Sequence, residues 1–72
     1  MKKWKKLTTK DLFEYLDVYT FVDGSEVTMA VNDFFRDYIE KDDNFQASYG
    51  ELIYFQELAD DYIKDRKLTF TN

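Results

Sequence analysis

The sequence predicts a small, mainly α domain of three helices, and three observations support this prediction. The 72 residues include no proline and only two glycines, so little interrupts long helical segments. Apolar residues recur at spacings of three and four in three segments, as one buried helix face requires. A capping box, Ser48-Tyr49-Gly50-Glu51, marks the start of the last segment. At this length we expect residues 1–72 to form a single domain.

The first helix is expected to begin after Thr8 or Thr9 and to end near residue 19. Asp11 stands where it would complete a capping pattern in the first turn. The helical period then places four apolar or aromatic side chains on one face, and this face is expected to be buried. These residues are Leu12, Tyr15, Leu16 and Tyr19.

Residues 18–31 allow two interpretations. In one, Asp23-Gly24 is a two-residue turn that joins a strand on either side of it. The fold would then be α+β, with a β-hairpin at residues 18–31 packed on two helices. In the other, the same residues are a loop followed by the start of a second helix.

The helical interpretation is favoured because its period persists to the end of the segment, whereas strand-like alternation stops near Met29. Ser25 would be the N-cap, and the helix would run from Glu26 to about Lys41. One stripe of this helix would be buried. It consists of Val27, Val31, Phe34, Phe35, Tyr38 and Ile39.

The last helix is expected over residues 49–67. The Ser48 hydroxyl would accept an N–H group of the first turn, and Glu51 would reach back to the cap. Lys64, Arg66 and Lys67 would complement the helix dipole in the last turn. Residues 68–72 would be a short strand or a tail. The apolar face would consist of Leu52, Phe55, Leu58, Ala59, Tyr62 and Ile63.

Charge is segregated along the chain, and the net charge is −5. Residues 1–10 carry five lysines and no acid, whereas residues 11–63 carry fourteen Asp or Glu against two basic residues. Such an acidic body attracts cationic surfaces and repels phosphate, so we expect a protein partner rather than nucleic acid or a membrane. Residues 1–7 are expected to be a flexible basic segment that stays in solvent, folds onto the acidic body or touches phosphate.

Several chemistries are excluded by composition and spacing. Without histidine or cysteine the chain has no Ser–His or Cys–His pair, zinc site or disulfide. An EF-hand loop starting at Asp42 would have Ala47 where glycine is needed and Ile53 where glutamate is needed. We therefore expect no enzyme, metal or cofactor. No apolar segment is long enough for a membrane span or a signal peptide, which predicts a cytoplasmic protein.

Two columns of carboxylates are the candidate binding residues, because acids three, four or seven positions apart share one helix face. Aspartate is a poorer helix former than glutamate, yet ten Asp stand against five Glu. Tyrosines are a second candidate, since they are enriched at protein interfaces. The candidate partner-binding residues are Glu26, Asp33, Asp37, Glu40, Glu57 and Asp61, with Tyr49 and Tyr54 as the tyrosines expected at the surface.

These features predict a non-enzymatic protein whose acidic face binds a basic surface of a protein partner. It would inhibit a nucleic-acid-binding machine by charge mimicry. In charge and size alone it resembles phage-encoded anti-restriction and anti-CRISPR inhibitors, and an abundance of Phe, Tyr, Asn, Ile and Lys is typical of AT-rich phage or bacterial genomes. Two alternatives remain: a small module that forms a homodimer through exposed aromatics, and a nucleic-acid binder that uses its basic ends.

Overall fold

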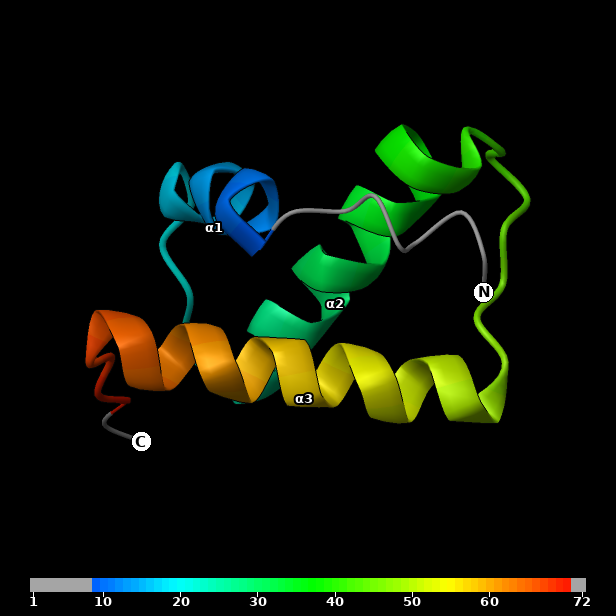
Figure 1. The fold of residues 1–72 in the computed structure, drawn as a ribbon. Helices are drawn as coiled ribbons and strands as arrows, with labels where there is room; N and C mark the ends of the chain where they lie inside the picture. Colours follow the sequence, from blue (N-terminus) through cyan, green and yellow to red (C-terminus); the bar gives the residue numbers. More distant parts are fainter. Residues whose placement is uncertain (1–8, 71–72) are drawn as a thin grey trace.

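Three helices form the fold in the computed structural model, which describes residues 9–70 (Figure 1). Helix α1 spans Thr9–Asp17, and α2 spans Gly24–Phe34 and continues directly as the π-helix η2 over Phe35–Glu40. Helix α3 spans Tyr49–Arg66. The mainly α prediction is therefore confirmed. The hairpin interpretation is wrong, since no strand occurs in the described part of the chain.

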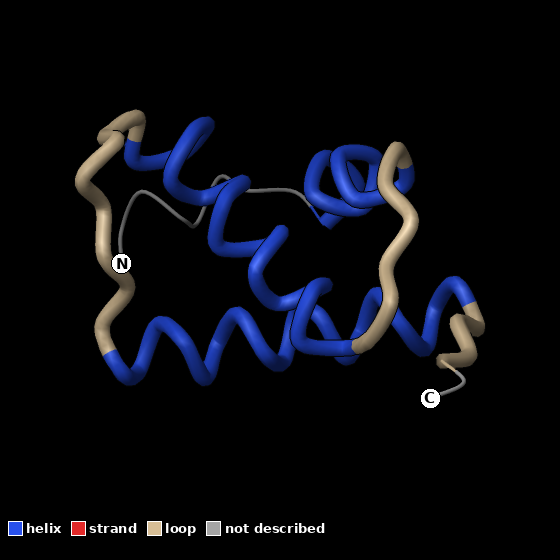
Figure 2. The backbone as a smooth tube through the Cα atoms, turned by 180° about the vertical axis from the view of Figure 1, so that it is seen from behind, coloured by secondary structure: helices blue, strands red, loops and turns tan. Residues whose placement is uncertain are grey.

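Helix α2 is the central element because it packs against both α1 and α3. It crosses α3 obliquely, and α1 lies beside α2 on the same side of α3 (Figures 1 and 2). Tyr15 of α1 packs on Phe34 at the end of α2, with ring centroids 5.2 Å apart. The α1–α2 linker, residues 18–23, descends from the end of α1 to the start of α2 near the C-terminal half of α3. This arrangement places the linker beside the outer surface of α2.

Helix α3 begins at the predicted capping box. Ser48 Oγ accepts the N–H of Glu51 at 3.2 Å, and Glu51 Oε1 accepts the N–H of Ser48 at 2.8 Å. The helix ends at Arg66, where Lys67 adopts a left-handed conformation with φ 56°. Residues 68–70 form no strand, and residues 71–72 lie outside the described part of the chain.

Replacing Ser48 with Ala is expected to lower the free energy of unfolding by about 1 kcal/mol, since one first-turn N–H loses its acceptor. Ser25→Ala is the matched control, because Ser25 lies inside α2 and its hydroxyl donates to Asp23 Oδ1 at 3.1 Å instead of capping a helix. Urea unfolding followed by circular dichroism measures both. Equal losses for the two variants would contradict this assignment of the caps.

Helix α2 is capped by Asp23, so the prediction of Ser25 as N-cap is wrong. Asp23 Oδ1 accepts the N–H of Glu26 at 3.0 Å, and Glu26 Oε1 accepts the N–H of Val22 at 2.7 Å. Asp23 has the extended backbone that a cap requires, which leaves Ser25 in the first turn. The bond from the Glu26 N–H, followed by the bond from Ser25, lowers the pKa of the Asp23 carboxyl.

The core is aromatic and is centred where α2 passes into η2. Phe35 stacks on Phe55 of α3 with ring centroids 4.6 Å apart, and neither side chain is exposed. Most of the predicted stripes are buried, but Tyr38 is 58% exposed and Leu52, predicted on the buried face of α3, is 41% exposed. The wider turn of η2, in which the Lys41 N–H bonds to the carbonyl of Arg36, moves Tyr38 out of the α-helical period. The buried residues are Leu12, Phe13, Leu16, Val27, Val31, Phe34, Phe35, Phe55, Ala59 and Tyr62.

Helix α1 contributes one core residue that the helical spacing of apolar residues did not predict. Phe13 is buried and meets the Tyr62 ring edge to face at 5.1 Å. The helix stops at Asp17, before the predicted end near residue 19, because the chain turns there into the linker. Tyr19 therefore leaves the helix face and becomes half exposed.

Candidate functional site

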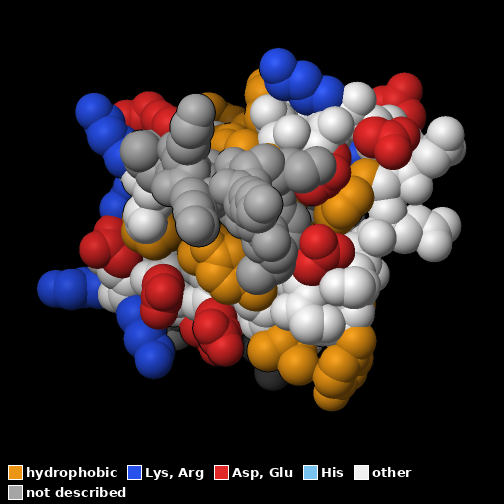
Figure 3. All heavy atoms as spheres, turned by 45° about the vertical axis from the view of Figure 1, so that its right-hand side comes forward, with side chains coloured by type: hydrophobic (Ala, Val, Ile, Leu, Met, Phe, Trp, Pro, Cys, Tyr) orange, Lys and Arg blue, Asp and Glu red, His pale blue; other side chains and the backbone are white. Residues whose placement is uncertain are grey.

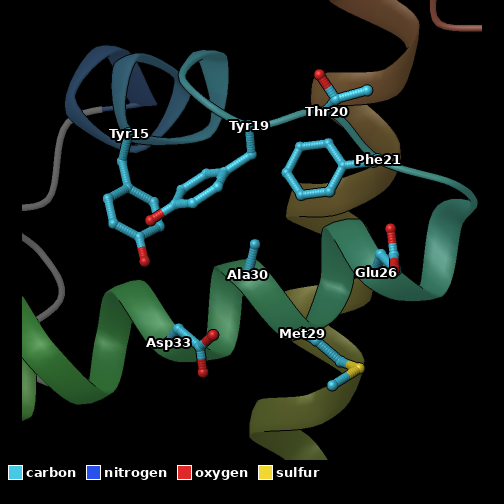
Figure 4. A pocket seen from close by; sticks show the side chains of 8 residues that line it. All are labelled: Tyr15, Tyr19, Thr20, Phe21, Glu26, Met29, Ala30 and Asp33. Atoms are coloured by element: carbon cyan, nitrogen blue, oxygen red, sulfur yellow. The ribbon is translucent and has the colours of Figure 1, made fainter.

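An open groove lies between α1, the α1–α2 linker and the outer surface of α2 (Figure 4). Its volume is about 310 Å³. Aromatic and apolar side chains make up most of its lining, and no lysine or arginine is among them. The lining residues are Tyr15, Tyr19, Thr20, Phe21, Glu26, Met29, Ala30 and Asp33.

Three rings form one wall of the groove. Tyr15 extends from the last turns of α1, and its ring centroid is 5.4 Å from that of Tyr19. The Tyr19 N–H bonds to the carbonyl of Leu16 at 3.1 Å, which turns the chain as α1 ends. Phe21 follows, 6.2 Å from Tyr19. Figure 4 shows the three rings in a row above α2, with Ala30 pointing toward them.

Two carboxylates stand at opposite ends of this row. Glu26 lies near the start of α2 and Asp33 near its end, and seven residues of helical rise separate them by about 10 Å. Glu26 uses Oε1 to accept the Val22 N–H, and Asp33 Oδ1 lies 3.2 Å from Arg36. In the described part of the chain, the second oxygen of each carboxylate has no hydrogen-bond partner.

Among the described residues, the only charged side chains that line the groove are the carboxylates of Glu26 and Asp33. Burial raises the pKa of the Tyr15 hydroxyl first, and interaction with Tyr19 and the negative charges of Asp33 and Asp37 raise this pKa further. Asp33, which lines the groove, and Asp37 beyond its end therefore place negative charge near Tyr15. A cation would lower its electrostatic energy by entering this groove.

The predicted carboxylate column on the second helix is partly neutralised by Arg36. This side chain lies 3.2 Å from Asp33 and binds both oxygens of Asp37, at 2.8 and 3.1 Å. The bond from Arg36 lowers the pKa of the Asp37 carboxyl. Glu26 is engaged in the cap, and Glu40 is half-buried on η2. In the sequence, Arg36 follows Asp33 by three residues, and this helical spacing indicates an ion pair between them.

The column on α3 is open to solvent. Glu57 and Asp61 are exposed, and so is the neighbouring Asp60. Within residues 9–70 none of these three carboxylates forms an ion pair or hydrogen bond, although Lys64 follows one turn later. On the face seen in Figure 3, acidic side chains stand apart from one another with hydrophobic side chains between them.

The two predicted surface tyrosines differ in their surroundings. Tyr49 is 81% exposed at the start of α3. Tyr54 is half-buried instead, because its ring packs 6.3 Å from Phe35 and 6.3 Å from Phe55. Tyr19 and Tyr38, which the helical stripes assigned to the core, are the other half-exposed tyrosines. The structure thus brings Tyr15, Tyr19 and the acids of α2 together, and leaves Tyr49 apart from them.

A second polar cluster, absent from the sequence prediction, joins α1 to α3. Arg66 donates to both oxygens of Asp17, each at 2.9 Å, and Tyr62 donates its hydroxyl to Asp17 Oδ1 at 2.7 Å. The guanidinium also lies over two rings, 5.3 Å from Phe13 and 5.5 Å from Tyr62. These contacts are internal to the fold, so the cluster stabilises the helix arrangement.

Comparison with protein-family models, curated proteins and solved structures finds no match. The described residues contain no group of three or more Asp or Glu side chains arranged to hold a metal ion. Over residues 9–70, no helix is long and apolar enough to cross a membrane. The roles predicted for residues 1–7 lie outside the described part of the chain.

Proposed function

We propose that this protein is a non-enzymatic binding protein whose acidic surface engages a basic surface of a protein partner. The observation that carries the proposal is the set of carboxylates on α3, Glu57, Asp60 and Asp61, which are exposed and have no cationic partner among the described residues. Asp60 also lines a hollow between α2 and α3 together with Met29, which is 65% exposed. An acidic rim beside apolar surface suits a partner that is basic and partly apolar.

In its specific form, this proposal makes the protein an inhibitor of a nucleic-acid-binding machine by charge mimicry. Residues 11–63 carry fourteen carboxylates, and the net charge of the chain is −5. A surface that binds phosphate through lysine and arginine would attract these carboxylates in the same way. The partner would then be displaced from the protein by DNA or RNA.

We expect the complex to weaken steeply as salt rises and to be competed by duplex DNA. Neutralising two exposed acids of α3, Glu57→Gln with Asp61→Asn, should weaken binding about fivefold, chiefly by slowing association. The matched control, Glu14→Gln with Asp43→Asn, removes the same charge elsewhere on the surface. Capture from lysate at low and high salt, followed by titration of the captured protein, measures both effects. Equal effects of the two double variants, or salt-independent capture, would contradict the proposal.

Self-association is the second candidate function, and one observation favours it. Tyr49 and Ile53 lie one turn apart on α3 and are 81% and 40% exposed, and Leu52 between them is 41% exposed. Apolar side chains gathered in this way mark interaction surfaces. In this case light scattering would give the mass of a dimer that persists in high salt. Tyr49→Ser with Ile53→Ser would return it to a monomer.

A further inference from the structure

We propose that the groove between α1, the linker and α2 binds an arginine side chain of the basic partner. The guanidinium would stack on the rings of Tyr15 and Tyr19 and pair with the carboxylate of Asp33 or Glu26. This inference rests on the proposed function and names one contact of the partner. The groove would be a binding site separate from the predicted columns of carboxylates.

The protein already holds one arginine in such surroundings. Arg66 lies over two rings, 5.3 Å from Phe13 and 5.5 Å from Tyr62, while its fork pairs with both oxygens of Asp17. The groove offers the same combination of adjacent aromatic rings and a nearby carboxylate, with no lysine or arginine among its lining residues. A partner arginine would therefore complete an arrangement that this chain forms internally.

Tyr19 is the most accessible of the three rings, whereas Tyr15 and Phe21 are half-buried. The Tyr19 side chain is 50% exposed. Its ring plane makes an angle of 60° with the ring of Tyr15 and 45° with the ring of Phe21, so the three rings do not lie parallel to one another. A cation is attracted to an aromatic face when it lies within about 6 Å of the centroid. The apolar stem of an arginine would pack on Ala30 and Met29 along the floor.

The carboxylates favour arginine over lysine. Asp33 and Glu26 each have one oxygen engaged within the chain, which leaves one oxygen each for a partner. A guanidinium carries several donors in a planar fork and stacks on rings, so it pairs with a carboxylate and a ring face at once. An ammonium group is a strongly hydrated point charge and loses more solvation on entering.

The groove borders a hollow that contains one of the exposed acids of α3. Met29 lines the groove and also lines the hollow, of about 450 Å³, that contains Asp60. An arginine of the partner bound in the groove would therefore bring the partner's neighbouring basic residues toward Asp60. One basic partner surface would cover both features.

Titration with a capped peptide that contains arginine among apolar residues tests the proposal. Two further peptides carry lysine or citrulline in place of arginine, and citrulline keeps the shape without the charge. In nuclear magnetic resonance spectra, the backbone amide chemical shifts that change on binding should be those of Tyr19, Ala30, Asp33 and their neighbours. The arginine peptide should bind at least threefold more tightly than the lysine peptide or the citrulline peptide. Equal binding of the citrulline peptide would overturn the proposal.

Tyr19→Ala should weaken binding of the arginine peptide about threefold to tenfold, whereas Tyr19→Phe should keep most of it, because the ring provides the attraction. Tyr49→Ala is the matched control, and circular dichroism verifies that each variant folds. Shifts centred on Glu57 and Asp61, with none in the groove, would overturn this inference and leave the proposed function standing. If the protein formed a homodimer through the groove in the absence of peptide, this result would also overturn the inference.

Discussion

Replacing Phe55 with Ala is expected to remove a large share of the free energy of folding. Phe55 is fully buried and stacks on Phe35 at 4.6 Å with an interplanar angle of 24°, so it joins α3 to the start of η2. Phe→Ala substitutions in cores cost about 3–5 kcal/mol. A chain of 72 residues has a total stability of about 4–11 kcal/mol. The substitution therefore removes much or all of the folding free energy.

Thermal and urea unfolding followed by circular dichroism measure this loss. Tyr49→Ala is the matched control, since it removes an aromatic ring from the same helix at a site that is 81% exposed, and it should change stability by less than about 0.5 kcal/mol. Phe55→Leu should lie between the two variants. If Phe55→Ala unfolded with the same midpoint as Tyr49→Ala, the Phe35–Phe55 stack would not be the centre of the core.

The parts of the fold that the sequence predicted correctly are those set by local interactions. The start of α3 was predicted to the residue, because Ser48 and Glu51 satisfy each other's backbone groups within one turn. The start of α2 was predicted two residues late, because Asp23 and Ser25 both suit a cap and only the extended backbone of Asp23 selects it. The π-helical end of α2 has no comparable local signal.

The candidate site was less predictable because it depends on how the linker folds over α2. Periodicity placed Tyr15 and Tyr19 on one helix face, but α1 ends at Asp17 and the linker then carries Tyr19 and Phe21 across the outer surface of α2. Helical spacing placed Asp33 and Asp37 together correctly. The three-residue spacing of Arg36 from Asp33 also indicates an ion pair, but the prediction of an open carboxylate column did not include Arg36, whose side chain reaches both acids.

The same chemistry therefore has two uses in this protein. An arginine between rings and a carboxylate holds α1 against α3 through Asp17 and Arg66. The groove beside Tyr19 presents rings and carboxylates outward, where a partner would supply the arginine. Variants of the internal cluster should change stability, and variants of the groove should change binding, so the two roles are separable by experiment.

Acid is expected to weaken the link between α1 and α3. The bonds from Arg66, followed by the bond from the Tyr62 hydroxyl, hold the pKa of the Asp17 carboxyl at about 2, below its ordinary value of 3.8. A carboxyl whose pKa is lower in the folded state contributes stability that is fully present above its unfolded pKa. This contribution should be complete above about pH 4 and should disappear as the pH falls toward 2.

Asp17→Asn should therefore be less stable than wild type at neutral pH, and the difference should shrink as the pH falls through the folded pKa of about 2. Asp23 and Asp37 also have lowered pKa values, so only this difference isolates Asp17. Urea unfolding between neutral pH and pH 2 measures it. Glu14→Gln is the control, since Glu14 is an exposed carboxylate 3.9 Å from Lys10 and should give a small difference at every pH. An Asp17→Asn difference that stayed constant through acid would show that Asp17 acts through packing rather than charge.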